Sequence, residues 1–186
     1  ERVFLETMPP AAEYKIDMAD LVLGRKLGKG EFGFVVKGVY SLPLPSGLKH
    51  EVAVAIKQVN AKYLADVKAM AAIVAENTRL ARCDSPFITK CFGMAQDIID
   101  RSLAIVMELC DLGDLKGHTN DRHWEILKGS RMCPLPHAEA ILITLNMLLG
   151  LAYIHNDLRL VHRDVAARNV MLKTGPGGAI VAQLAD

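Results

Sequence analysis

Apolar and polar residues alternate along several short segments in the first half of the chain. Between residues 52 and 57, large apolar side chains at even positions alternate with Ala53, Ala55 and Lys57 at odd positions. This period of two predicts a β-strand that places Lys57 on one face with the two alanines. Further strand signals occur at 21–40, 87–94 and 102–109. The first of these stretches is interrupted by closely placed glycines, so it is expected to form a strand, a glycine turn and a second strand.

The period changes to that of an α-helix in two places. Apolar side chains fall near helical spacing from Tyr63 to Leu80, and a long helix is predicted from about His137 to His155. The apolar centre of the long helix, 140–154, is shorter than the ~20 residues that a bilayer span needs, so a core helix is expected. The predicted fold class is α+β: a mostly antiparallel sheet carrying one helix, a short connector, and then a helical part.

Composition excludes several classes of function. The chain has 186 residues, enough for one domain or two small lobes, and a formal charge of +1, which gives no electrostatic case for binding nucleic acid or an anionic membrane. Its four cysteines lack CxxC spacing, so reduced thiols are expected and a cysteine metal site is not. The chain opens on Glu1 without the pattern of a signal peptide, and we expect that it begins inside a larger protein.

The glycine-rich stretch "GKGEFGFV" has the pattern GxGxxGxV, with Gly28, Gly30, Gly33 and Val35 at the fixed positions. Alone, this pattern is as consistent with an ordinary glycine hairpin as with a nucleotide site. A dinucleotide fingerprint needs a following helix, whereas "FVVKGVY" is rich in strand-forming residues. The pattern therefore favours a hairpin whose backbone N–H groups can lie over phosphate oxygens.

Lys57 and Glu76 form a second candidate pair. A single strand lysine more often extends into solvent, and a single helix glutamate more often lies on a solvated face. However, an antiparallel third strand would bring the Lys57 ammonium under the glycine turn, where it can bind phosphate. Glu76 would then be the ion-pair partner that holds Lys57 in position. Since an exposed ion pair contributes only ~0–1 kcal/mol to stability, the pair would serve positioning rather than stability.

The stretch "LVHRDVAARNVML" crowds polar groups between two apolar runs, and buried polar groups need partners. "HRDVAARN" matches the catalytic loop HRDxxxxN of protein kinases at every fixed position. The chain resembles this family from about Leu21 to Asp186, and its motifs occur in the family's order. "AAR" between Asp164 and Asn169 resembles the tyrosine-kinase group. The resemblance implies a two-lobe fold with a small lobe of sheet plus one helix and the start of a helical lobe.

The resemblance also implies a role for individual residues. The catalytic set is Asp164, Arg168, Lys57 and Glu76, with Asp164 accepting or orienting the substrate hydroxyl. Magnesium (Mg²⁺) is expected at Asn169 and Asp186. ATP is expected to contact Gly28, Gly30, Gly33, Val35, Ala55, Lys57, Met107, Glu108, Cys110 and Asp114, with Met107 in the gatekeeper place and Asp114 near the ribose.

The implied organisation has four parts: a lead-in resembling a juxtamembrane segment (1–20), the N-lobe (21–107), the hinge (108–114) and a partial C-lobe (115–186). Since the family continues past Asp186 with Phe and Gly, these residues alone are expected to be unstable and inactive although the parent is active. "VMELCDLGDLKG" resembles the insulin-receptor group, which implies a cytoplasmic part of a membrane receptor that dimerises.

Three functions remain open at this point. The first is phosphorylation of protein tyrosine from ATP and Mg²⁺. The second is a pseudokinase that binds nucleotide without transfer, against which the intact Lys57, Asp164, Asn169 and Asp186 weigh. The third, small-molecule phosphotransfer, is disfavoured by the "AAR" sequence.

Overall fold

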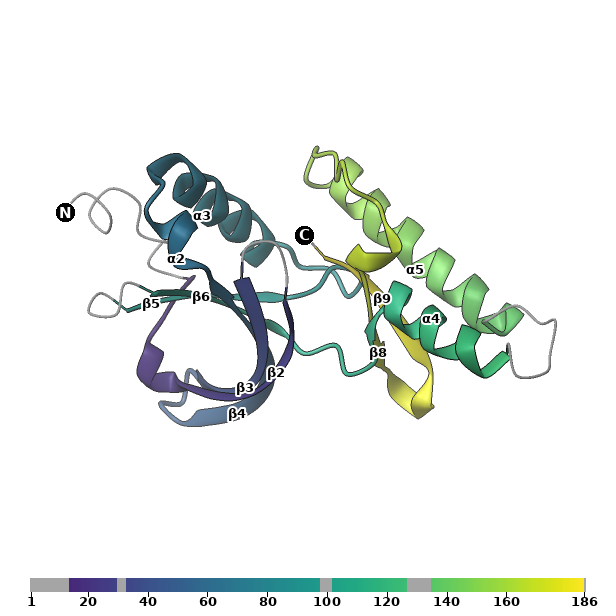
Figure 1. Ribbon diagram of the computed structural model, residues 1–186, viewed down its shortest axis with the longest axis horizontal. Coiled ribbons are helices and arrows are strands. Elements are labelled where there is room, and N and C mark those ends of the chain that lie inside the picture. Colours follow the sequence, from purple (N-terminus) through teal and green to yellow (C-terminus); the bar gives the residue numbers. More distant parts are fainter. Residues whose placement is uncertain (1–13, 30–32, 98–101, 127–134, 186) are drawn as a thin grey trace. The chain divides into compact units, whose positions relative to one another are not determined.

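The computed structural model describes residues 14–29, 33–97, 102–126 and 135–185 (Figure 1). The chain divides into two units, and each is described here by itself. The first unit comprises Glu1–Cys83 and Lys90–Leu109, and the second comprises Asp84–Thr89 and Cys110–Asp186. Gly30, Asp186 and the cysteine at position 133, all singled out from the sequence, lie outside the described residues.

The first unit contains a six-stranded sheet with the order β1-β5-β6-β4-β3-β2. Its strands are β1 (Lys15–Ile16), β2 (Leu21–Lys29), β3 (Gly33–Pro43), β4 (Lys49–Val59), β5 (Cys91–Asp97) and β6 (Ser102–Glu108). Every pair is antiparallel except β1 with β5, which is parallel. The predicted mostly antiparallel sheet is therefore confirmed. The predicted lead-in (1–20) contributes to this sheet through β1, whose Ile16 is buried in the core.

One helix of 15 residues, α3 (Val67–Ala81), covers one face of this sheet (Figure 1). It starts later than the predicted Tyr63 because the Asp66 carboxylate accepts hydrogen bonds from the N–H groups of Lys68 (2.9 Å) and Ala69 (3.2 Å). This is an N-cap, and residues before it form the separate short helix α2 (Ala61–Leu64). A short 3-10 turn, η2 (Met18–Asp20), precedes β2.

Both faces of the sheet carry a buried apolar cluster. Leu103 and Ile105 of β6 pack in the cluster that includes Met70, Ile73 and Val74 of α3. The alternate residues Ala104 and Val106 pack in the other cluster, with Val54 and Ile56 of β4. Because successive side chains of a strand point to opposite faces, this alternation assigns each side chain of the sheet to a face. The α3-covered face is called face A below, and the other is face B.

The second unit combines helices with a three-stranded sheet of order β7-β8-β9. Its helices are α4 (Leu115–Ile126) and α5 (His137–Asn156), its strands are β7 (Gly113–Asp114), β8 (Val170–Thr174) and β9 (Ile180–Leu184), and its 3-10 turns are η3 (Ala167–Asn169) and η4 (Pro176–Gly178). The helices agree with the predicted helical part, and this additional small sheet was not predicted from the sequence. Its two longer strands flank the turn Gly175–Gly178. Most of their residues are apolar, and the β-branched Val170, Thr174, Ile180 and Val181 favour strands.

Helix α5 has the predicted bounds to within one residue, but its burial differs from that of a core helix. One side of it is bound to β9: the Asn146 Oδ1 accepts a hydrogen bond from the Ala182 N–H (3.0 Å), and a Cβ on Gly150 would lie 3.0 Å from Leu184. The other side is exposed and apolar, with Ile141, Leu142, Leu145, Leu148 and Leu149. By length and composition alone, α5 could also cross a membrane.

We predict that the exposed side of α5 limits the solubility of the 1–186 polypeptide. Replacing Ile141, Leu145 and Leu148 (67%, 48% and 57% exposed) with Lys, Gln and Lys removes an apolar stripe from water. The soluble fraction after centrifugation should rise severalfold. The control Ile143→Gln introduces a polar side chain at a position that is 3% exposed, and it should lower the soluble fraction. Equal solubility of the triple variant and the wild type would contradict this prediction.

Among the described residues, Cys83, Cys91 and Cys110 carry buried thiols. Burial raises the pKa of the Cys91 thiol to about 11, so it stays protonated at neutral pH. Burial also raises the pKa of Cys83. These thiols pack as small apolar side chains with weak S–H donors.

Candidate functional site

Most candidate residues that lie in the strands of the first unit share face A of the sheet. Across neighbouring strands, Gly28 lies opposite Val35, Val35 opposite Lys57, and Lys57 opposite Ile105. Directly opposed residues point to the same face, so this row lies on the face that α3 covers. Ala55 and Met107 form the neighbouring row on the same face. The register thus brings together Lys57, Val35, Ala55 and Met107 from three strands.

The two described glycines of the GxGxxGxV stretch have different surroundings. A Cβ built on Gly33 would lie 1.8 Å from the Gln58 carbonyl oxygen of β4, so any side chain there collides with a neighbouring strand. A Cβ built on Gly28 would meet none of the described residues within 4 Å. Gly33 is therefore required by the packing of the sheet itself. No packing contact requires Gly28, and its bare backbone leaves room for a ligand to approach closely.

Glu76 lies on α3, which covers face A, and its side chain is exposed. Within the described part of the chain, no hydrogen bond or ion pair joins Glu76 to Lys57. The structure thus places both residues on one side of the sheet without linking them directly. Their pairing stays a prediction.

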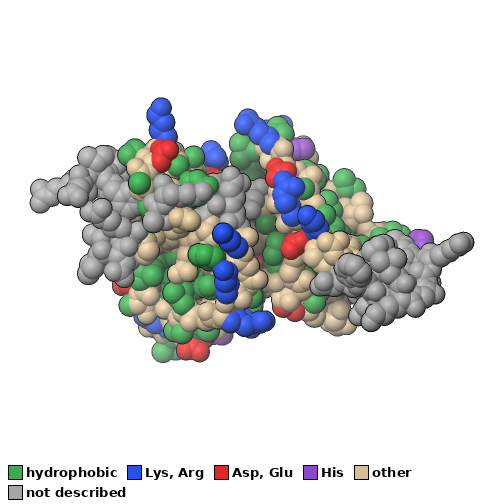
Figure 2. All heavy atoms as spheres, in the orientation of Figure 1, with side chains coloured by type: hydrophobic (Ala, Val, Ile, Leu, Met, Phe, Trp, Pro, Cys, Tyr) green, Lys and Arg blue, Asp and Glu red, His purple; other side chains and the backbone are tan. Residues whose placement is uncertain are grey.

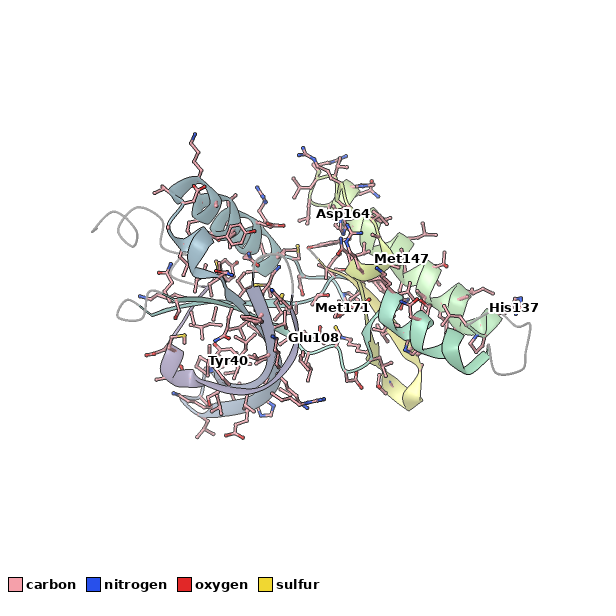
Figure 3. All side chains as sticks on the ribbon, viewed as in Figure 1. Tyr40, Glu108, His137, Met147, Asp164 and Met171 are labelled. Carbon is pink, nitrogen blue, oxygen red and sulfur yellow. The ribbon has the colours of Figure 1, made fainter. Side chains whose placement is uncertain are left out.

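The residues expected at the hinge fall at the end of the first unit and the start of the second. The Glu108 N–H donates to the Lys90 carbonyl (2.8 Å), which anchors the end of β6 (Figure 3). In the second unit, the Asp114 carboxylate accepts from the Gly117 N–H (2.9 Å) and so caps α4. The Cys110 thiol donates to Gln183 Oε1 (3.5 Å). The expected nucleotide contacts of these residues are not tested by this geometry.

Asp164 in the second unit is held by two nearby side chains (Figure 3). The Arg168 Nη2 donates to both carboxylate oxygens of Asp164, at 2.8 and 2.6 Å. The Asn169 Nδ2 donates to Asp164 Oδ2 (2.8 Å) and to the Asp164 backbone carbonyl (2.9 Å). Since these residues follow Asp164 by only four and five positions, the turn η3 brings them back onto it.

The backbone around Asp164 is anchored to β9. Arg163 has a left-handed conformation (φ 68°), an uncommon conformation for a residue with a side chain, and it turns the chain immediately before Asp164. The Asn169 carbonyl accepts a hydrogen bond from the Ala185 N–H (2.9 Å), directly before Asp186. Asn169 is buried, whereas Asp164 and Arg168 are more than half exposed. The loop therefore presents one fixed carboxylate to solvent.

Two polar residues that were not predicted from the sequence, Gln183 and Asp111, form hydrogen bonds that hold the second unit together. Gln183 is 2% exposed, and besides its bond from Cys110 its Nε2 donates to the Pro86 carbonyl (3.1 Å). A lone polar residue within the apolar stretch "IVAQLA" was the available signal. Asp111 accepts hydrogen bonds from the N–H (2.8 Å) and hydroxyl (2.7 Å) of Thr174, which lower its pKa. Both residues tie the start of the second unit to its sheet.

Comparison with known proteins decides the family. Residues 21–186 match the family model of protein tyrosine and serine/threonine kinases. This chain belongs to the protein kinase family. Two similar relatives are the receptor tyrosine-protein kinases erbB-2 of Mesocricetus auratus and Rattus norvegicus, each 29% identical over 168 residues. The matched region covers 90% of this chain and 12% of each relative, so the chain spans about an eighth of their length.

Protein kinases generally use ATP with Mg²⁺, and the described oxygen donors of this kinase fit a hard cation. The Asn169 Nδ2 donates its hydrogen bonds to Asp164, so the Asn169 Oδ1 would be the atom that binds the cation, beside the Asp164 carboxylate. The described residues contain no group of three or more His, Cys, Asp or Glu that could hold a metal. Oxygen ligands from ATP phosphates and water commonly complete such a Mg²⁺ site.

The hydrogen bonds from Asn169 and then Arg168 lower the pKa of the kinase's Asp164 below its ordinary 3.8. Its carboxylate is therefore ionised throughout the physiological pH range. A lowered folded-state pKa means that ionised Asp164 favours the folded state above its unfolded pKa. This contribution is lost as pH falls through the folded-state pKa.

We predict that removing the Asn169 donor raises this pKa. In an NMR titration that follows the Asp164 carboxyl carbon, the wild-type midpoint should lie below 3.8. In Asn169→Ala the midpoint should move upward, since the largest cause of the lowering is gone. Arg168→Met should move it upward by a smaller amount. A wild-type midpoint at or above 3.8 would contradict the geometry.

Proposed function

We propose that this chain is the catalytic region of an active protein tyrosine kinase that transfers the ATP γ-phosphate to protein tyrosine hydroxyls. The observation that carries the proposal is the ionised Asp164 carboxylate, exposed to solvent and fixed by Arg168 and Asn169. A carboxylate in this state can accept a hydrogen bond from an incoming hydroxyl and then its proton. Membership of the kinase family supports phosphate as the group transferred.

In this proposal, Asp164 orients the tyrosine oxygen and takes its proton as the oxygen bonds to the γ-phosphorus. The bond from the γ-phosphorus to the bridging oxygen breaks, and ADP leaves with that electron pair. Arg168, whose guanidinium donates to Asp164, would offset negative charge on the transferred group. Asn169 and Asp186 would hold Mg²⁺, which neutralises phosphate charge. Phosphoryl transfer depends mainly on such positioning and electrostatics.

The nucleotide side of the proposal rests on face A of the first unit. Lys57, in line with Val35 and Gly28, would bind the α- and β-phosphates under the backbone of Gly28, Gly30 and Gly33. Val35, Ala55 and Met107 offer apolar surface to the adenine, Glu108 and Cys110 offer backbone groups to its edge, and Asp114 would meet the ribose. Glu76, on the helix that covers face A, would pair with Lys57.

Tyrosine specificity and receptor membership are the finer parts of the proposal. The "AAR" sequence in the catalytic loop supports tyrosine, and two similar relatives are named receptor tyrosine kinases. "VMELCDLGDLKG" supports a place in the insulin-receptor group. We therefore propose a cytoplasmic kinase region of a receptor that spans the membrane once and dimerises.

The test uses a polypeptide that contains residues 1–186 together with the residues that follow them in the natural protein. It is incubated with ATP, Mg²⁺ and matched peptide libraries whose acceptor is tyrosine, serine or threonine. Phosphotyrosine alone would support the proposal. Phosphoserine or phosphothreonine alone would overturn the tyrosine part and leave a protein kinase.

A pseudokinase, which would bind nucleotide without transferring phosphate, is the second candidate function. Both candidates predict ATP binding, which a fluorescent ATP analogue measures. Binding of the ATP analogue without transfer to any of the three libraries would favour the pseudokinase.

A further inference from the structure

An exposed aromatic ring lies beside the glycine turn with two lysine ammonium groups over it. Phe34, the residue after Gly33, is 40% exposed. The Lys26 Nζ lies 3.7 Å from the centroid of its ring, and the Lys29 Nζ lies 6.0 Å from it. Both distances are within the ≈ 6 Å over which a cation is attracted to the face of an aromatic ring.

This cluster lies on the opposite face of the sheet from Lys57. Lys29 is directly opposite Phe34, and Lys26 is directly opposite Val36. Val36 belongs to the face B core, whereas the row Gly28–Val35–Lys57 is on face A. The ring is therefore outside the proposed nucleotide contacts. Any effect on nucleotide must act through the strands that carry Gly28 and Val35.

Strand β2 has few other side-chain contacts that could hold its end in place. It is the edge strand of the sheet, and its side chains from Val22 to Leu27 are exposed. Its pairing with β3 shifts register on both sides of Lys26, between Leu23 and Lys26 and between Lys26 and Gly28. Burial of apolar surface therefore contributes little here, and the broken ladder leaves the end of β2 weakly fixed.

The two lysines have no competing partner among the residues that the structure describes. Neither ammonium forms an ion pair there, so the Phe34 ring is the group that both of them approach. Lys and Arg side chains gather over β2 and β3 in Figure 2. Because Lys26 and Lys29 flank Gly28 in β2, the ring of β3 holds the strand on both sides of that glycine.

We propose that Phe34 is a positioning residue whose cation–π clamp with Lys26 and Lys29 fixes the Gly28 backbone for nucleotide binding. This inference rests on the proposed function of the glycine turn in holding ATP phosphates. An exposed cation–π contact shifts a local equilibrium by about twofold to fivefold. Loss of the clamp therefore raises the KM for ATP by about this factor and leaves kcat unchanged.

The test compares two pairs of variants in the polypeptide that extends past Asp186. Phe34→Leu keeps apolar bulk without the aromatic ring, and Phe34→Tyr keeps the ring. Lys26→Met keeps most of the aliphatic side chain and removes its positive charge, whereas Lys26→Arg keeps a positive charge. Amide hydrogen exchange in β2 and β3 and steady-state kinetics with ATP are measured for all four. Phe34→Leu and Lys26→Met should exchange about twofold to fivefold faster near Gly28, whereas Phe34→Tyr and Lys26→Arg should match the wild type.

The double variant Phe34→Leu with Lys26→Met should change KM by little more than either single variant, because both remove one interaction. Wild-type exchange rates in Phe34→Leu would overturn the clamp. Faster exchange with an unchanged KM would overturn its positioning role. If the wild-type protein neither binds ATP nor transfers phosphate, the proposed function fails, while the exchange rates still decide whether the clamp exists.

Discussion

Replacing Asp164 with Asn should reduce phosphate transfer by at least about 100-fold, the lower end of the usual contribution of a positioned general acid or base. The amide cannot take the tyrosine proton, and it carries no negative charge to orient the hydroxyl. The assay measures initial rates of peptide phosphorylation by the polypeptide that extends past Asp186, at saturating ATP and Mg²⁺.

The controls separate lost chemistry from lost structure. In the Asp164→Asn variant, an amide oxygen at the position of Oδ2 can still accept from Arg168 and Asn169, and only the bond from Arg168 to Oδ1 is lost. The loop should therefore keep its conformation, and the Kd for ATP should stay within twofold of the wild type. Transfer at more than a tenth of the wild-type rate would show that Asp164 is not the residue that handles the proton.

Replacing Gly33 with Ala should destabilise the first unit by about 3 kcal/mol or more, at or above the upper end of the range for overpacked sites. The new Cβ would lie 1.8 Å from the Gln58 carbonyl oxygen, which belongs to backbone and cannot turn aside as a side chain would. Relief requires β3 and β4 to separate at Gly33 and Val59, which are directly opposite in the ladder. The urea midpoint of unfolding measures this loss.

Gly28→Ala is the matched control, since the two positions are neighbours in the same motif. None of the residues that the structure describes lies within 4 Å of its new Cβ, so the free energy of unfolding should change by less than about 0.5 kcal/mol. The KM for ATP should nevertheless rise, because the methyl group occupies space that the proposed phosphate contact needs. Equal losses of stability in the two variants would contradict the division of roles between these glycines.

Local patterns in the sequence were sufficient to predict most elements of the first unit. The alternation at 52–57 predicted a strand with Lys57 beside Ala53 and Ala55, and β4 confirms it. Strand alternation and helical spacing depend on neighbouring residues, which interact before distant contacts form. The HRDVAARN motif was likewise sufficient for the protein kinase family, which residues 21–186 confirm.

Local patterns predicted less where the answer depends on residues far apart in the chain. The β8–β9 hairpin was missed because its short apolar strands are ambiguous until they pair with each other and support α5. The start of α3 depended on the Asp66 cap, whose signal is a single residue. The exposed side of α5 also differs from the core helix that its apolar sequence predicted.

By itself, the sequence determined the α+β fold class, the kinase family and the residue types available for phosphate chemistry. Only the tertiary structure decided that Gly28, Val35 and Lys57 form one row and that the Phe34 ring lies on the other face. It also decided that the Gln58 carbonyl leaves no room for a side chain at Gly33. The physical reason is that register and facing depend on hydrogen bonds between strands, and these join residues that no local pattern connects.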